Sequence, residues 1–196
     1  MGFVVNCAKL VADLLVNCNN PILGGTRDNC WIFNFDDMQN ALISRNVTNP
    51  QIIEGVTPPS GVVGFTVQGL NNSIMPKNEL IKGKFLNSWK HEVNFKAFSL
   101  NPTIKAQIEI IGKGKFVVII ENVYKGDTGE AAFEIYGLDS GLVGTVVQRD
   151  PSNADTQGAY DITLASSDQS REQHPPATFY LTSYAATRSL IAAIVS

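Results

Sequence analysis

The chain has 196 residues, which suits one domain with room for an additional arm. Its net charge of −3 argues against a nucleic-acid binder that works through a basic face, because phosphate contacts need clustered Lys and Arg. Apolar residues make up 44% of the chain and charged residues only 17%, below the usual quarter or so of a soluble protein. This low charge favours a surface covered by partner subunits, with a weakly charged monomer as the alternative.

The cysteine pattern argues against both a zinc site and a disulfide framework. Cys7, Cys18 and Cys30 are an odd number and all lie in the first 30 residues. They form no CxxC pair, and the only two histidines, His91 and His174, are far away in sequence. We therefore expect reduced thiols in a protein that is made in the cytoplasm.

The N-terminal segment does not have the pattern of a targeting signal. Met1–Val16 is rather apolar, but it lacks a basic start, and Lys9 and Asp13 interrupt the apolar run. No uninterrupted apolar stretch approaches the roughly 18 residues of a membrane span. The sequence predicts a soluble protein without a membrane partner.

Residues 1–29 are predicted to form an arm that precedes a single β-rich domain at 30–196. Cys7–Val16 places apolar residues at helical spacing, and Asn19-Asn20-Pro21 would end such a helix. Gly24-Gly25 then supplies a flexible connection to the domain.

The first part of the domain contains short strand patterns separated by turns. Cys30–Phe35 is aromatic and β-branched, which is typical of a strand. The turn-rich region 36–59 has one short strand pattern around Gln51–Val56, and Val62–Val67 is the next predicted strand.

The longest strand pattern runs from Ile81 to Phe98. Its odd positions are mainly apolar and its even positions carry Lys, which is the period of a half-buried antiparallel strand. Eighteen residues would span roughly 60 Å, whereas a typical strand has about five or six residues. The strand must therefore either bend sharply, near Gly83 or Asn87-Ser88, or project from the domain.

A projecting strand exposes edge groups and an apolar face that need a partner. This segment is therefore the candidate self-assembly site, and a strand that bends around a barrel is the alternative. The candidate residues are Phe85, Trp89, Val93, Phe95, Lys84 and Lys90.

A helix is predicted after this segment. Asn101 suits the N-cap, Pro102 suits the first helical position, and Gly112 suits the end. Isoleucines at positions 104, 108 and 111 fall on one face, which should pack on a sheet.

The remaining segments predict more strands and a closing helix. They are a fully buried strand at Phe116–Tyr124, a turn at Lys125–Gly129, a return strand at Ala131–Tyr136, a short strand at Thr145–Gln148 within the loop Gly141–Asp155, a strand at Ala159–Ala165, a polar loop at Ser166–Pro176 and a helix at Ser183–Val195. The expected fold class is therefore mainly β, an antiparallel β-sandwich or partly closed barrel with one packed central helix and a C-terminal helix.

No catalytic, cofactor-binding or metal-binding motif is recognisable, so we expect no enzyme and no cofactor. Gly112–Lys115 lacks the spacing of a phosphate-binding loop, and no G-x-S-x-G motif occurs. His91 lies on the apolar face of the long strand, where a hydrogen-bonded core or interface histidine is expected. The enzymatic alternative is a hydrolase that uses Asp36 or Asp37 with His91.

Several segments between Gly69 and Tyr160, about half of the chain, resemble bacteriophage tail-tube (major tail) proteins. They are Gly69-Leu70-Asn71-Asn72, Lys84-Phe85-Leu86-Asn87-Ser88-Trp89-Lys90-His91, Tyr124-Lys125-Gly126, Ala132-Phe133-Glu134-Ile135-Tyr136-Gly137-Leu138-Asp139 and Gln157-Gly158-Ala159-Tyr160. None of these pieces is a mechanistic motif.

The resemblance implies a virion protein of the tail that is synthesised in the host cytoplasm. It implies six subunits per ring, rings stacked through loops and arms, and DNA that passes through the lumen without specific binding. Tape-measure and terminator proteins would be further partners. The alternatives are a neck, terminator or baseplate adaptor protein, the inner tube of a contractile injection machine, and a monomeric β-sandwich module that binds sugar or peptide.

Overall fold

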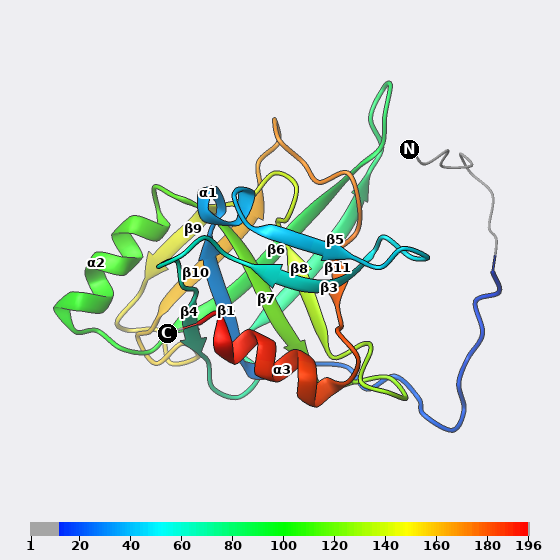
Figure 1. Cartoon of the computed structure of the whole chain (residues 1–196). Coiled ribbons are helices and arrows are strands. Elements are labelled where there is room, and N and C mark those ends of the chain that lie inside the picture. Colours follow the sequence, from blue (N-terminus) through cyan, green and yellow to red (C-terminus); the bar gives the residue numbers. More distant parts are fainter. Residues whose placement is uncertain (1–11, 196) are drawn as a thin grey trace.

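The computed structural model describes residues 12–195, and within this range the chain is mainly β, with 41% strand and 14% helix (Figure 1). The strands are β1 (Thr26–Asn34), β2 (Leu42–Arg45), β3 (Ile52–Thr57), β4 (Phe65–Gln68), β5 (Met75–Ile81), β6 (Ser88–Ala97), β7 (Lys115–Asn122), β8 (Phe133–Tyr136), β9 (Leu142–Arg149), β10 (Tyr160–Ser166) and β11 (Ala177–Phe179). The helices are α1 (Phe35–Gln39), α2 (Pro102–Ile111) and α3 (Tyr184–Ala193). The mainly β fold class predicted from the sequence is confirmed.

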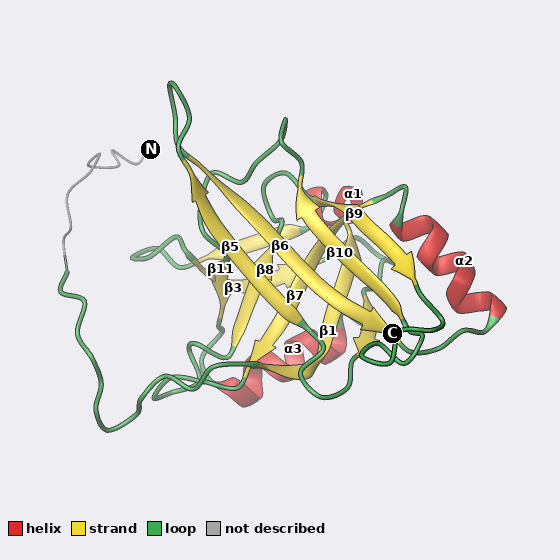
Figure 2. Ribbon diagram, turned by 180° about the vertical axis from the view of Figure 1, so that it is seen from behind, coloured by secondary structure: helices red, strands yellow, loops and turns green. Residues whose placement is uncertain are grey.

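The described strands form one large mixed sheet. Its main path runs β2-β3-β11-β8-β7-β9-β10-β6-β5, while β1 pairs with β7 and carries β4 on its other side. The β3–β11 pair is parallel and the other pairs are antiparallel. The sheet does not close into a barrel. Instead, β5, β6 and β10 cross over β7 and β8, and the sheet packs against itself (Figure 2).

Strands β1 and β7 lie at the centre of this arrangement because both of their faces are covered. Ile32 and Val118 face one core cluster together with residues of β6, β10 and α2. Phe33 and Val117 face a second cluster with residues of β3, β8, β11 and α3. Burial on both faces explains the nearly continuous apolar run of β7, which the sequence predicted.

The predicted central and C-terminal helices are present as α2 and α3, and each covers part of the core. The Asn101 side chain accepts a hydrogen bond of 2.8 Å from the backbone N–H of Ile104, which caps α2 as expected. Ile108 is buried in one core cluster. Ser183 caps α3 by accepting from the backbone N–H of Ala186 at 3.2 Å, and Ile191 packs into the other cluster.

The N-terminal arm differs from the prediction at both of its ends. Strand β1 begins at Thr26, inside the predicted arm 1–29. Of the predicted helix Cys7–Val16, residues 12–16 are not helical, and the rest lies outside the described residues. Between residue 12 and β1 the chain runs as an extended segment along the outside of the domain (Figure 1).

The single long strand predicted for Ile81–Phe98 is wrong, because the chain reverses within it. Strands β5 and β6 form an antiparallel hairpin in which Ile81 pairs with Ser88, so residues 82–87 make the connection. At Gly83 a Cβ atom would collide with the carbonyl oxygen of Leu86, so the turn needs glycine there. The reversal lies where the sequence placed a sharp bend, near Gly83 or Asn87-Ser88. The hairpin also extends beyond the body of the domain (Figure 2), so both the bend and the projection are present.

Candidate functional site

Two of the six predicted self-assembly residues are core residues. Val93 and Phe95 on β6 are 0% and 1% exposed and belong to the cluster between β6, β10 and β7. Their side chains anchor the hairpin in the domain, so they cannot form a surface in this fold. The period-two pattern correctly identified the apolar face of β6, but the chain covers this part of the face itself.

Trp89 and Lys90 lie at the base of the projecting hairpin and are half-buried. The backbone N–H of Trp89 donates to the carbonyl of Glu172 at 2.8 Å, and its carbonyl accepts from the Glu172 N–H at 3.0 Å. Lys90 lies 3.8 Å from the Glu92 carboxylate, a partly exposed ion pair that contributes little. Trp89 therefore marks the place where the covered part of the hairpin ends.

The remaining two residues, Lys84 and Phe85, form the tip of the hairpin together with Leu86. Phe85 is 86% exposed and Leu86 is 83% exposed. The ammonium of Lys84 lies 5.4 Å from the centre of the Phe85 ring, within the range of a cation–π contact. We call Lys82–Leu86 the hairpin tip. Leu86 was not among the predicted residues because it belongs to the Lys-bearing row of the predicted strand, and this part of the chain is in fact a turn.

Leu80 lies between the hairpin tip and the core, on the face of the hairpin that is turned towards the domain. It pairs across the strands with Trp89 and is partly exposed. Residues 80, 89, 93 and 95 share one face of the sheet, so an apolar stripe runs outwards from the core to the tip. The outer end of this stripe is uncovered in the single chain.

The extended arm carries a second group of exposed apolar side chains. Leu14, Leu15 and Val16 are each more than 80% exposed. The arm is attached beside them, because the side-chain amides of Asn17 and Asn20 donate to the Asp127 carboxylate at 3.1 and 2.7 Å. Asp127 thus holds the arm on the turn between β7 and β8.

His91 ties the base of the hairpin to two loops. Its Nδ1 accepts a hydrogen bond of 3.2 Å from the backbone N–H of Gly137, and its Nε2 donates to the carbonyl of His174 at 3.0 Å. The ring also meets that of Tyr136 edge-on at 5.4 Å. Burial lowers the pKa of His91 to about 4, so the ring is neutral at neutral pH. This confirms the hydrogen-bonded core histidine that the sequence predicted.

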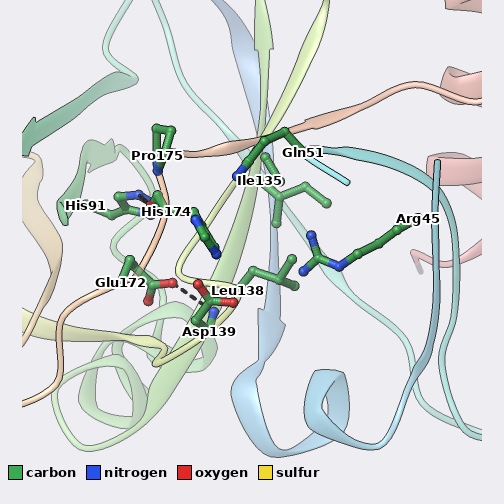
Figure 3. A pocket seen from close by; sticks show the side chains of 10 residues that line it. Arg45, Gln51, His91, Ile135, Leu138, Asp139, Glu172, His174 and Pro175 are labelled. Atoms are coloured by element: carbon green, nitrogen blue, oxygen red, sulfur yellow. Dashed lines mark hydrogen bonds between the residues drawn. The ribbon is translucent and has the colours of Figure 1, made fainter. Parts of the chain in front are cut away.

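Glu172 completes this junction from the opposite side (Figure 3). Its carboxylate is buried and accepts from the backbone N–H groups of Asp139 at 2.8 Å and Ser140 at 3.0 Å. Burial raises the pKa of Glu172 above its usual value, against the effect of these hydrogen bonds. His91 and Glu172 together fix the loops after β8 and before β11 to the hairpin base.

The depression beside this junction does not offer a ligand site. It is lined by Arg45, Leu138 and His174 among others, and its empty space of about 240 Å³ includes open solvent. Small-molecule sites occupy about 300–1,000 Å³. Arg45 donates to the carbonyl of Pro50 at 2.8 Å.

The hydrolase alternative has no support in this geometry. Both ring nitrogens of His91 are occupied by backbone groups, and Asp37 accepts from the Asn34 side chain at 3.0 Å at the start of α1. Among residues 12–195 there is also no cluster of His, Cys, Asp and Glu that could hold a metal ion.

Replacing Glu172 with Ala should lower the free energy of unfolding by roughly 2 kcal/mol, because two backbone N–H groups lose a charged acceptor. Amide hydrogen exchange should accelerate at Asp139 and Ser140. An Asp168→Ala variant is the matched control, since Asp168 makes only an exposed ion pair with Arg171. Unchanged exchange at both amides would show that Glu172 does not hold this loop.

The two described cysteines differ in their exposure. Cys30 is buried and its pKa is raised to about 12 by that burial, whereas Cys18 on the arm is exposed. Cys7 lies outside the described residues. Within residues 12–195, no helix has the length and apolar character needed to cross a membrane.

Comparisons with known proteins leave the family open, because no family model, curated protein or solved structure matches this chain.

Proposed function

We propose that this chain is a structural subunit that assembles with copies of itself, most specifically as the subunit of a bacteriophage tail tube. The observation that carries the proposal is the concentration of uncovered apolar side chains in two projecting segments. Seven described large apolar side chains are at least 80% exposed, and six of these lie on the arm or the hairpin tip: Leu14, Leu15, Val16, Ile22, Phe85 and Leu86. Monomeric proteins rarely gather such residues without a partner.

The open sheet supports the same proposal. Strands β2 and β5 each pair with only one described strand, so each leaves one edge free for a neighbour. Strand β4 pairs with β1, and Gly64 directly before it forms a bridge with Val195. On β5, Pro76 and Lys77 make that edge a poor template for pairing. Strand β2 lacks such protection and exposes 77% of Leu42, so it is the more suitable edge for a partner.

The exposed face of β5, β6 and β10 suits a surface past which DNA moves without binding. Its Lys and acidic residues form the ion pairs Lys77–Glu79, Lys90–Glu92 and Lys96–Asp161. This balance leaves no basic stripe to hold phosphates. The resemblance adds the expectation of hexameric rings in the virion tail, with tape-measure and terminator proteins as further partners.

Negative-stain electron microscopy of the purified protein tests the tail-tube role. Stacked rings that form tubes of uniform width are the expected result. Single rings that do not stack would instead favour a neck, terminator or adaptor protein. Isolated small particles at all concentrations would contradict assembly and favour a monomeric binding module.

A further inference from the structure

We infer that the arm segment Asp13–Val16 of one copy docks on the hairpin tip Lys82–Leu86 of a second copy. This inference rests on the proposed self-assembly and names the two surfaces that would meet. The arm and the tip are different parts of the chain, so the contact can repeat head-to-tail from one copy to the next. Head-to-tail contacts generate closed rings or open filaments, whereas a reciprocal exchange of arms between two copies would give a symmetric dimer.

The apolar parts of the two segments are complementary in kind and extent. Leu14, Leu15 and Val16 form a continuous apolar run, and each is 83–87% exposed. Phe85 and Leu86 are similarly exposed at the end of a hairpin whose inner stripe leads into the core. Covering these five side chains on association would remove their apolar surface from water, which favours binding.

The charges beside these apolar groups are opposite. Asp13 is the only charged residue between positions 12 and 26, and it directly precedes the apolar run of the arm. Lys82 and Lys84 lie in the tip, just before Phe85, and no acidic residue occurs from Lys82 to Ser88. None of these three charges forms an ion pair within residues 12–195. Bringing the segments together would pair a free carboxylate with free ammonium groups and would fix the register of the contact.

The arm is attached to its own domain next to the proposed docking segment, and this attachment favours docking of Asp13–Val16 on a second copy. Asn17 and Asn20 fix the arm to Asp127 directly after the apolar run, so Asp13–Val16 extends from a held point. Fixing one end reduces the conformational entropy that the segment loses when it binds. The same attachment leaves its side chains uncovered by their own chain.

Cysteine cross-linking tests this contact directly. In a Cys7→Ser, Cys18→Ser background, one copy carries Leu15→Cys and a second, distinguishable copy carries Leu86→Cys. Mild oxidation of the mixture should give the mixed disulfide in at least about tenfold excess over a Leu15→Cys and Val47→Cys mixture. Val47 is the matched control because it is 90% exposed on a different turn.

A charge exchange provides a second readout. Asp13→Lys and Lys84→Glu should each raise the concentration for half-assembly several-fold, and the double variant should recover much of the loss. Assembly of the background protein without selective cross-linking would overturn the inference while leaving the proposed function intact. If the unmodified protein did not assemble at all, both the inference and the proposed function would be overturned. A disulfide that forms within one chain at every dilution, or a tip that binds anionic vesicles instead of the arm, would also overturn the inference.

Discussion

Replacing Phe85 and Leu86 together with Ser should raise the protein concentration needed for self-association by about 100-fold or more. Burying a Phe or Leu side chain contributes about 1.5–3 kcal/mol each, and about 1.4 kcal/mol corresponds to a tenfold change in an association constant. The expected loss of about 3 kcal/mol or more therefore disperses the assembly. Sedimentation velocity across a dilution series measures it.

The fold of this variant should be unaffected, because both side chains are more than 80% exposed in the single chain. Its free energy of unfolding should stay within about 0.5 kcal/mol of the parent value. Ile110→Gln is the matched control, since it removes apolar surface that is 51% exposed on α2. If the tip variant assembles like the parent protein, or if Ile110→Gln disperses it equally, the tip is not the contact surface.

Acidification should remove about 3 kcal/mol of stability through His91 as the pH falls from about 6.5 to about 4. Burial lowers the pKa of folded His91 from 6.5 to about 4, so over this range the unfolded state binds the proton and the folded state does not. The contribution is therefore fully present above pH 6.5 and is lost on acidification. Protonation also removes the lone pair of Nδ1 that accepts from Gly137.

Glu172 has the opposite effect on stability as the pH falls, so the contribution of His91 has to be measured against a variant that lacks the histidine. Its pKa is raised above 4.5 in the folded protein, and its own contribution to stability therefore increases as the pH falls towards 4.5. His91→Gln keeps a donor and an acceptor but removes the titration of residue 91. Urea unfolding gives the free energy of unfolding of the parent protein and of His91→Gln from pH 7 to pH 4, and the difference between them is the contribution of the histidine. If both proteins lost the same stability over this range, the burial of His91 as a neutral ring would be contradicted.

Local signals in the sequence predicted the central strands and both long helices. The apolar run at Phe116–Tyr124 predicted β7, and the alternation at Ala159–Ala165 predicted β10. Asn101 and Ser183 located the starts of α2 and α3 through their side-chain caps. In each case the residues that determine the element lie within it or directly beside it in the sequence.

Elements determined by distant partners were not predicted. Strand β11 has three residues and exists through its pairing with β3 and β8, where Phe179 lies beside Ile53. A sharp bend near Gly83 or Asn87-Ser88 was one of the two predicted solutions, but a full reversal into two paired strands was not predicted, because apolar and polar residues alternate through the turn as they do through the strands. The turn also lacks an Asn-Gly or Asp-Gly pair, the strongest short-range hairpin signal.

Only some of the predicted self-assembly residues lie on the surface, again because contacts with distant parts of the chain decide which residues are covered. Period two assigns Val93, Phe95, Trp89 and Phe85 to one row, but it does not tell how far the rest of the chain covers that row. Strands β1 and β7 pack on the inner residues, and the tip extends past them. The placement of Asp127 against the arm depends on contacts across more than 100 residues, which no local pattern contains.

Light scattering of the purified chain over a range of protein concentrations tests self-assembly most directly. The expected result is a mass that rises with concentration from the 21.3 kDa of one chain to that of a defined multimer. A mass that stays at 21.3 kDa up to about millimolar concentration, the affinity of a very weak complex, would contradict self-assembly.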